Sequence, residues 1–395
     1  MLEKIKQHLE KFTFDIKVSR DSRFTDQKVI PDVLSAVSEC VLEYIQENKN
    51  MPFSKTDIWK SNFANDTIMD VFSKPNLKNA DNEYNKFFAQ PLKALAAAKI
   101  LHETKRKKTN IYTVNEYEIL SYIAKRERHA LNFLNLYLTK VLEDSNIYQE
   151  FELFFKCQDK TTFKNLRKTL FTFYHTNTNI KGKYEPPRIF NKIINILAYK
   201  RKSKGSIKGQ LSKNIISIEE IRYNKVNWRD FNKDKNLTRE EYKTKFEEKI
   251  NTNNANQYYL YNIKKAKSFV KNLHPYSEIH RFEAYPATQA HHIFMQSEFP
   301  NIADLPENII ALTPNQHYYY AHPNNNTKYV DEYYLIICLL AKLDSIEINF
   351  RENKEDYSLK DFIKVLNIGF STNHFKTTMN YEKLKHEIVK LTYSK

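Results

Sequence analysis

The sequence is poor in glycine, with 4 glycines among 395 residues. Glycine-rich loops that cradle phosphates and the dinucleotide-binding fingerprint need glycines at fixed spacing, so both are excluded. Cys40, Cys157 and Cys338 lie too far apart in sequence for a disulfide framework or a thiolate zinc site. The longest apolar run, Leu335 to Ala341, is far shorter than the roughly 18 residues of a membrane span. We therefore expect no membrane contact and an intracellular, cytoplasmic protein.

Positive charge exceeds negative charge, with 63 Lys and Arg against 47 Asp and Glu and a net charge of +16. Such an excess favours a polyanionic partner. Hydrophobic residues make up 41% of the chain, enough to offset the entropy lost on ordering. The residue patterns described below predict a mainly α fold with small β elements, an α+β class.

The N-terminal region combines helices with short extended segments. Apolar positions at helical spacing predict a helix within residues 30–49, and a short extended segment follows at 51–53. Ser54 is the N-cap expected for a helix over residues 55–61. After a polar insert, a second helix is expected over residues 82–99.

Two strands, at residues 100–104 and 110–114, are expected to flank a basic turn. Helix, strand, two helices and a hairpin with a cationic tip is the order of a winged helix, so residues 1–115 are predicted to bind DNA. A solvated turn explains the charge run about as well as a phosphate contact does. The cations of this turn are Lys105, Arg106, Lys107 and Lys108.

Residues 116–250 are predicted to form a helical middle region, with a long helix over 116–144 and another over 239–250. Aromatic and leucine positions between them recur near helical spacing, which favours core packing over base stacking. These positions are Phe151, Phe154, Phe155, Phe163, Leu166, Leu170 and Phe173.

A basic segment at residues 176–213 interrupts this region, with a helix expected over 188–198 and a glycine-containing loop after it. Such a segment suits contacts to a phosphate backbone, and a flexible solvated linker is an equal alternative. The candidate DNA contacts here are Arg188, Lys200, Arg201, Lys202 and Lys204.

Histidines cluster near the C-terminal end, with 6 of the 12 between residues 274 and 322. A single histidine is usually a satisfied core residue, which is the interpretation of His274 and of His280 taken alone. His291 and His292 are adjacent, and in a strand their side chains point to opposite faces. One can then bind a metal while the other faces a different part of a cleft.

This segment resembles the HNH, or ββα-metal, nuclease motif. A strand ending in His-His-Ile is followed by a loop, by Glu-Asn-Ile-Ile-Ala-Leu and by a helix that carries a histidine. The signature positions are His292, Asn308 and His317, separated by 16 and 9 residues. The resemblance implies that His292 is the general base, that Asn308 rigidifies the loop and helps to orient the base, and that His291 and His317 bind a metal.

The spacing of His322 departs from the family pattern. Some members place a further ligand four residues after the helix histidine, where this chain has Ala321. In an α-helix each residue turns by about 100°, so a side chain five residues on points about 100° away from that direction. His322 can still reach the metal if the helix ends before Pro323, so a ligand, a capping role and a DNA contact all stay open.

The resemblance implies one divalent metal ion per site, Mg²⁺, Mn²⁺ or Zn²⁺, and imidazole ligands favour Zn²⁺, Mn²⁺ or Ni²⁺. The structural zinc found beside many such motifs is not expected, because the cysteines for it are missing. Ordinary core packing must then hold the module. Its expected core residues are Leu312, Tyr319, Tyr333, Leu335 and Ile336.

As a whole, the chain is similar to type II restriction endonucleases of the HNH class. The implied activity is sequence-specific hydrolysis of double-stranded DNA, in the bacterial cytoplasm, beside a cognate DNA methyltransferase with no direct contact implied. Residues 251–350 are the expected nuclease module. Residues 351–395 are an expected helical extension that packs on this module or joins two protomers, so a homodimer on DNA stays open.

Separate recognition and cleavage modules favour the type IIS subtype, which cuts at a fixed distance from its site. Two alternatives remain. One is another HNH enzyme, such as a homing, nicking or modification-dependent endonuclease. The other is a non-catalytic winged-helix regulator that binds DNA. Metal-dependent plasmid cleavage separates this regulator from every nuclease.

Overall fold

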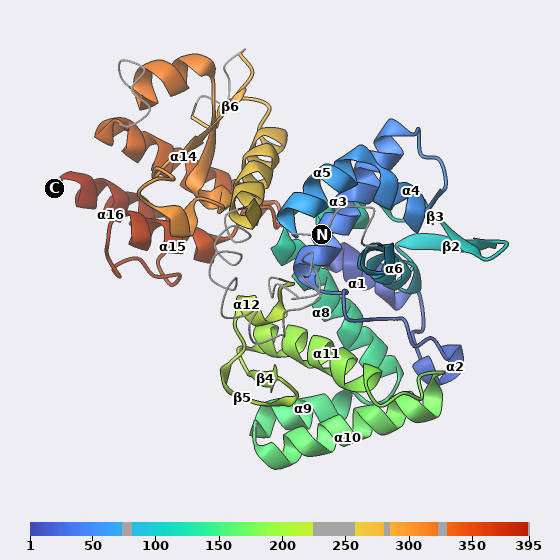
Figure 1. Ribbon diagram of the computed structural model, residues 1–395. Helices are drawn as coiled ribbons and strands as arrows, with labels where there is room; N and C mark the ends of the chain where they lie inside the picture. The colour runs from blue at the N-terminus through green and yellow to red at the C-terminus, as the bar shows by residue number, and fades with distance from the viewer. Residues whose placement is uncertain (73–80, 224–256, 280–284, 323–329, 394–395) are drawn as a thin grey trace, which may run out of the picture. The chain divides into compact units, whose positions relative to one another are not determined.

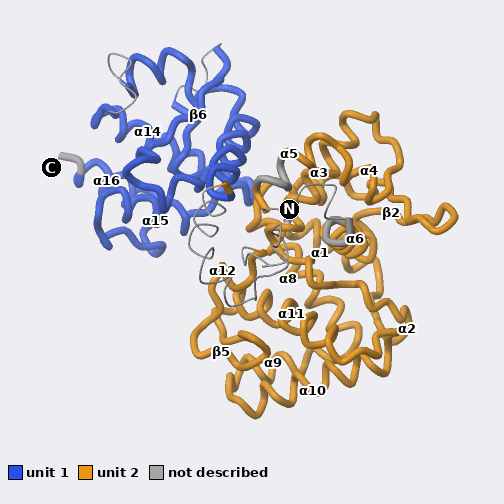
Figure 2. Tube along the Cα trace, viewed as in Figure 1, with its two compact units in different colours: residues 1, 258–395 blue, residues 2–257 orange. Residues whose placement is uncertain are grey.

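The computed structural model describes residues 1–395 except 73–80, 224–256, 280–284, 323–329 and 394–395. It is mainly helical, and its described strands form three small antiparallel sheets, which confirms the α+β class (Figure 1). The chain divides into two compact units, residues 2–257 and residues 258–395 with Met1 (Figure 2). Among the described helices, none is both long enough and apolar enough to cross a bilayer.

The first part of the larger unit has the predicted order of helix, short strand, helices and hairpin. Its elements are α1 (Leu2–Glu10), α2 (Ile16–Ser19), α3 (Pro31–Glu47), β1 (Phe53–Ser54), α4 (Lys55–Lys60), α5 (Asn62–Val71), α6 (Asp81–Ala97), β2 (Leu101–Arg106) and β3 (Thr109–Val114). The sheet order is β1-β3-β2. As predicted, Ser54 caps α4, in a capping box with Asp57. Helix α5 takes the place of part of the expected polar insert, with Ala64 and Val71 buried.

Helix α3 is the centre of this part because its apolar positions fall on one buried stripe. Val33, Leu34, Val37 and Val41 are fully buried, each at 0% exposure. Burial of one such side chain is worth about 1.5–3 kcal/mol. The stripe packs against the helices that follow the hairpin, α7 (Tyr117–Lys125) and α8 (Glu127–Asp144), so residues 1–115 and the region after them share one core.

Asp32, near the start of α3, is a buried carboxyl group that accepts two backbone hydrogen bonds. The N–H groups of Val33 and Tyr223 donate to it at 2.9 and 2.6 Å. Burial, reinforced by the Glu127 carboxylate, raises the pKa of Asp32 from 3.8 to about 7. The folded state therefore keeps a proton between about pH 4 and pH 7 that the unfolded chain releases.

We expect the free energy of unfolding to fall as pH rises through this window, because the folded state favours protonated Asp32. At about 1.4 kcal/mol per pKa unit, the loss is at most about 4 kcal/mol. The change Asp32→Asn should remove this part of the pH dependence. Urea unfolding between pH 4 and pH 8, followed by far-UV circular dichroism, measures it. Equal slopes in the variant and the wild type would contradict this assignment.

The single helix predicted over residues 116–144 is wrong, because the chain is extended at Arg126 between α7 and α8. In a continuous helix the Arg126 N–H would bond to the Tyr122 carbonyl. That carbonyl instead accepts a hydrogen bond from Nδ1 of His129, at 3.0 Å. The two rings also stack, with centroids 4.0 Å apart. This buried side-chain contact accompanies the end of α7.

The rest of the larger unit is helical with one hairpin. Its elements are α9 (Tyr148–Cys157), α10 (Lys160–Asn177), α11 (Glu185–Arg201), β4 (Lys204–Ile207), β5 (Gln210–Ile215) and α12 (Ile218–Ile221). The predicted core positions are buried, except Phe155, which is half-buried. The helix predicted over residues 239–250 lies outside the described residues.

The basic residues at the end of α11 and after it do not form a flexible linker. They form the last turn of α11 and the β4–β5 hairpin. Lys202 ends α11 in the left-handed conformation, with φ 52°. Gly205 lies against α11, where a Cβ would come within 2.6 Å of Asn195 Oδ1. Asn195 also bonds both backbone groups of Ser206, at 2.7 and 2.8 Å. The hairpin is thereby held on the helix.

The smaller unit begins within a helix over residues 257–273 and has one core around a strand pair. Its other elements are β6 (Gln289–His292), the 3-10 turns η2 (Pro300–Ile302) and η3 (Pro306–Asn308), β7 (Ile309–Leu312), the π-helical turn η4 (Gln316–Ala321), α14 (Glu332–Arg351), α15 (Leu359–Gly369) and α16 (Tyr381–Tyr393). The described residues after 350 pack on this core through Phe362, Leu366, Leu384 and Ile388. The expected extension is thus part of the module.

Three of the five core residues predicted for this module are in or against its core. Leu312 and Ile336 are buried, and Leu335 packs against them. The prediction that Tyr319 and Tyr333 are core residues is wrong, because their side chains are 73% and 67% exposed. Tyr319 lies on the outer side of the turn η4, and Tyr333 lies at the exposed start of α14.

Candidate metal centre

The strand pair β6–β7 fixes the two adjacent histidines. His291 lies opposite Ile310 and His292 opposite Ile309 in the antiparallel register. Because side chains alternate along a strand, the two imidazoles leave β6 on opposite faces. Both are buried, at 3% and 9% exposure. The two side chains are therefore arranged as the sequence predicted, with one free to face a metal and the other facing elsewhere.

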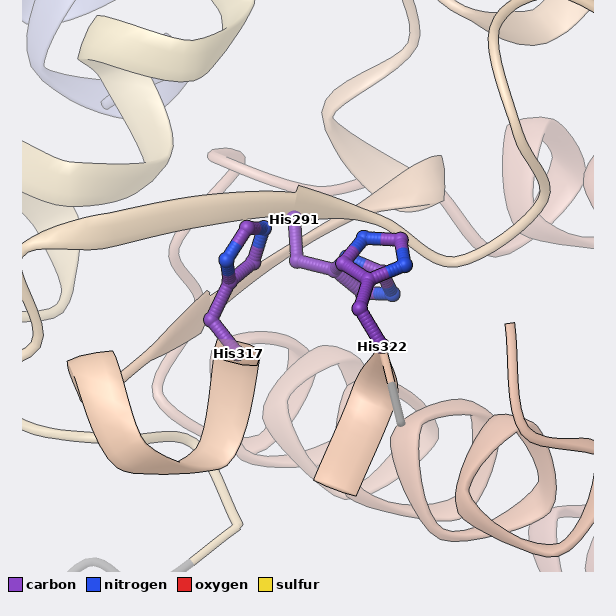
Figure 3. A group of neighbouring side chains, drawn as sticks. All are labelled: His291, His317 and His322. Atoms are coloured by element: carbon purple, nitrogen blue, oxygen red, sulfur yellow. The ribbon is translucent and has the colours of Figure 1, made fainter. Parts of the chain in front are cut away.

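His291, His317 and His322 converge on one point (Figure 3). Each offers one ring nitrogen, and these nitrogens lie within 4.8 Å of one another. Figure 3 shows His291 reaching from the strand towards the two histidines of the turn. The ring centroid of His291 is 5.3 Å from that of His317 and 4.9 Å from that of His322. Three imidazoles at this spacing can bind one transition-metal ion.

His322 joins this group because the turn η4 is π-helical and not α-helical. The N–H of His322 donates to the carbonyl of His317 at 3.1 Å, an i to i+5 hydrogen bond. An i to i+5 hydrogen bond brings the fifth residue closer to the direction of the first one than α geometry does. The backbone thus brings the His322 ring beside the rings of His291 and His317.

The donor set of the three histidines fits a bound metal. His291 Nε2 and His317 Nδ1 are buried without a hydrogen-bond partner in the described part of the chain. Such orphaned nitrogens are costly unless something binds them. Burial and the neighbouring histidines lower the pKa of His291, and that of His317 falls to about 4. Both rings are therefore neutral at pH 7, the form that binds metals.

Removing one histidine tests this centre directly. We expect the wild type to bind one Zn²⁺ per chain and His322→Ala to bind it at least about 100-fold more weakly. Even a partner that only orients a metal ligand is worth roughly 10- to 100-fold in affinity. Isothermal titration calorimetry measures both values. His386→Ala, a change of an exposed histidine of the same unit, should bind like the wild type. Unchanged affinity in His322→Ala would remove it from the ligand set.

His292 lies on the other face and is held by one backbone contact. Its Nε2 is 3.0 Å from the carbonyl oxygen of Ala303. A carbonyl only accepts, so Nε2 carries the proton and Nδ1 keeps a lone pair. Burial, with the charge of Lys267, lowers the pKa of His292 to about 4, so the ring is neutral at pH 7. A neutral imidazole in a fixed tautomer can accept a proton.

Asn308 closes the loop between the two strands. Its side chain bonds both backbone groups of Phe294, at 2.9 and 3.0 Å, and its own carbonyl accepts from Ile293 N at 2.8 Å. The side chain is fully buried. The Phe294 ring in turn lies on Gly369 of α15, where a Cβ would come within 2.3 Å. Asn308 therefore has the loop-rigidifying geometry that the family resemblance implies.

Two features of the smaller unit escaped the sequence analysis. One is Lys267, on the helix over residues 257–273, whose charge lowers the pKa of His291, His292 and His317. The other is a buried ion pair between Glu278 and Lys342. The only sequence signal for the pair is a lysine directly after the longest apolar run.

Glu278 holds the strand β7 in place through hydrogen bonds to its backbone. Its Oε1 accepts from Ala311 N at 2.9 Å, and its N–H donates to Ala311 O at 3.1 Å. The Lys342 ammonium lies 2.7 Å from the carboxylate, and neither side chain is exposed. Lys342 also donates to the hydroxyl of Tyr357, which is hydrogen-bonded to His274. His274 is thus a satisfied side chain, as expected, and belongs to this network.

The cations predicted to contact DNA all lie in the larger unit. Lys105, Arg106, Lys107 and Lys108 are exposed at the β2–β3 turn. Arg188 and Lys202 are exposed too, and Lys204 is half-buried.

Two of these cations have partners within the protein. Lys200 donates to Asn132 at 2.7 Å. Arg201 donates to the Tyr148 hydroxyl and lies 4.9 Å from the Phe155 ring. The Arg201 side chain therefore takes part in packing within the larger unit. Its alanine variant would change folding stability as well as any DNA binding.

Comparisons with known protein families, with curated proteins and with solved structures found no match. The function must therefore be argued from the chemistry of the described residues.

Proposed function

We propose that this chain is a metal-dependent endonuclease of the HNH type. The observation that carries the proposal is the arrangement along β6: three convergent imidazoles on one face and a neutral, tautomer-fixed imidazole on the other. Phosphodiester hydrolysis needs a base for water and positive charge for the phosphate and the leaving oxygen. The strand β6 and the turn η4 together supply groups suited to both.

In the proposed mechanism, His291, His317 and His322 hold a divalent ion. When bound, that ion supplies a Lewis acid for the scissile phosphate and the departing oxygen. Nδ1 of His292 accepts a proton from the attacking water while Nε2 stays bonded to the Ala303 carbonyl. Asn308 keeps the loop that carries this carbonyl in place. Three nitrogen ligands favour Zn²⁺, Mn²⁺ or Ni²⁺ over Mg²⁺.

We further propose that residues 1–115 are a winged helix that binds double-stranded DNA. Support comes from the element order, from the β1-β3-β2 sheet and from four exposed cations at its hairpin turn. A recognition unit joined to a nuclease module is the layout of a type II restriction endonuclease, with type IIS as the subtype. Such an enzyme works beside a DNA methyltransferase in the bacterial cytoplasm.

Cleavage of several unrelated plasmids by the purified full chain, with Mg²⁺, Mn²⁺ or Zn²⁺, tests the proposal. Discrete bands are expected from a site-specific enzyme, and sequencing their ends gives the site and the cut distance. A smear would keep the nuclease and remove the restriction function. If no metal supports cleavage of either plain or cytosine-methylated plasmid, the nuclease proposal fails and DNA binding alone remains.

A further inference from the structure

The helix α10 divides its surface into three sectors, because successive residues turn by about 100° around the helix axis. One sector is apolar and belongs to the buried core of the larger unit. A second sector carries only threonine and asparagine side chains. The third sector holds every Lys and Arg of the helix, within an arc of about 100°. Its cations are Lys160, Lys164, Arg167 and Lys168, and α10 contains no acidic residue.

The basic sector continues onto the β4–β5 hairpin through one arginine. The Arg167 guanidinium donates to the Gly209 carbonyl in the hairpin turn at 3.2 Å, and it lies 5.1 Å from the centre of the Phe171 ring. Lys208, directly before Gly209 in this turn, is exposed, and the hairpin contains no acidic residue. We define the basic ridge by its exposed lysines, Lys160, Lys164, Lys168 and Lys208.

The lysines of the basic ridge have no anion within the protein. In the described part of the chain, none of the four has a side-chain hydrogen bond or an ion pair. The carboxylate nearest in sequence, Asp159, instead accepts from two backbone N–H groups in the first turn of α10. By contrast, Lys140 of α8 is paired with Asp144 at 2.5 Å. The ridge lysines of α10 lie four residues apart, where like charges destabilise a helix, so an external anion would relieve their repulsion.

The shape of the ridge indicates which kind of anion binds there. Along α10 its ammonium groups follow one another at intervals of about 6 Å, whereas a small anion needs groups that converge on one point. A row of charges fits a linear polyanion. The neighbouring hydroxyl and amide side chains suit hydrogen bonds to phosphate and sugar oxygens. A helix that lies on a membrane inserts its apolar face, but the apolar face of α10 is already buried in the core.

We propose that the basic ridge binds the phosphate backbone of double-stranded DNA. The choice of DNA rests on the function proposed above, whereas the polyanion follows from the charges and their spacing. Contacts of this kind add affinity and salt dependence but carry no sequence information. The ridge is thus a DNA-binding surface in addition to the hairpin turn of the winged helix and the basic residues around the end of α11.

Titration of a fluorescein-labelled DNA duplex of mixed sequence with the full chain, in EDTA and at several KCl concentrations, tests the ridge by fluorescence anisotropy. The triple change Lys160→Gln, Lys164→Gln and Lys168→Gln removes three charges and keeps the helix, because lysine and glutamine have similar helix propensities. Each lost phosphate contact lowers the slope of log affinity against log salt by about 0.9, so we expect a slope smaller by about 2.7 and a Kd at least about 10-fold higher at low salt. The charge-keeping triple Lys160→Arg, Lys164→Arg and Lys168→Arg should keep the wild-type slope.

A matched control separates the position of these charges from their number. The triple change Lys6→Gln, Lys11→Gln and Lys383→Gln removes three exposed lysines elsewhere in the chain and should leave the slope at the wild-type value. Equal thermal unfolding midpoints by circular dichroism show that all variants are folded. An equal loss of slope in the control would mean that only net charge matters, and it would overturn the ridge as a binding surface.

The assay needs no cleavage, so this inference and the nuclease proposal can fail separately. An unchanged slope in the ridge glutamine triple, with plasmid cleavage by the wild type, would overturn the inference and leave the nuclease standing. Ridge-dependent DNA binding by a wild type that cuts no plasmid would support the inference and overturn the nuclease. Tighter ridge-dependent binding to an RNA duplex or to phosphatidylserine vesicles than to the DNA duplex would overturn the choice of DNA.

Discussion

Alanine in place of His292 is expected to slow plasmid cleavage by about 10²- to 10⁴-fold, the usual contribution of a general base. His292 is neutral at pH 7, and its Nδ1 carries the free lone pair because Nε2 donates to Ala303. Zn²⁺ affinity should stay at the wild-type value, since the side chain leaves β6 on the face opposite His291. Single-turnover cleavage of supercoiled plasmid and calorimetry with Zn²⁺ measure the two effects.

The separation of rate from metal affinity makes this prediction specific. His322→Ala is expected to lose both cleavage and metal, and the exposed control His386→Ala to lose neither. Near wild-type cleavage by His292→Ala would mean that another group accepts the proton. Loss of Zn²⁺ together with cleavage would instead make His292 a metal ligand and would contradict the proposed division of roles between the two faces.

Lys342→Met is expected to destabilise the smaller unit by about 3–5 kcal/mol. The Glu278 carboxylate has no exposed surface, and without Lys342 it would be a buried charge with only the His274 ring, 3.5 Å away, beside it. Urea unfolding of the full chain measures the change. The effect should reach the metal centre too, because Glu278 bonds both backbone groups of Ala311 in β7.

The double change Glu278→Gln with Lys342→Met should recover most of this loss, because it removes both buried charges and keeps an acceptor for Ala311 N. Lys354→Met is the matched control: both side chains of its ion pair with Glu352 are at least half exposed, and such a pair is worth about 0–1 kcal/mol. If Lys342→Met were no more destabilising than Lys354→Met, the pair would have no role in holding β7.

That His291 and His317 lie together was expected from the resemblance to the HNH motif, whose short unit of two strands and a turn brings such positions together. His322 could not be assigned, because a π turn depends on which carbonyl its N–H meets, and composition does not encode that choice. The break at Arg126 has the same origin, a side chain bonding a carbonyl that the helix would otherwise use.

Long-range partners explain the other differences. In the sequence, Lys342 only follows an apolar run. Its partner Glu278 lies 64 residues earlier, so the sequence alone gives no sign of the ion pair. Arg201 reads as part of a basic loop until Tyr148 and Phe155 take its guanidinium. Tyr319 and Tyr333 read as core because aromatic residues are often buried, yet each lies on the outer side of its turn or helix.

The packing of Gly369 under Phe294 has a consequence for how this module can be exchanged between proteins. The strand pair, the loop and the turn span little more than 30 residues, from Gln289 to His322. A segment this short suggests a unit that could be moved between proteins by itself. The loop held by Asn308 nevertheless needs a helix 60 residues further on that has no side chain at the contact point. A segment transferred without the residues after the turn would lack Gly369, and the Phe294 ring would lose the surface on which it packs. Recombination can therefore conserve this chemistry only by carrying the C-terminal helices with it.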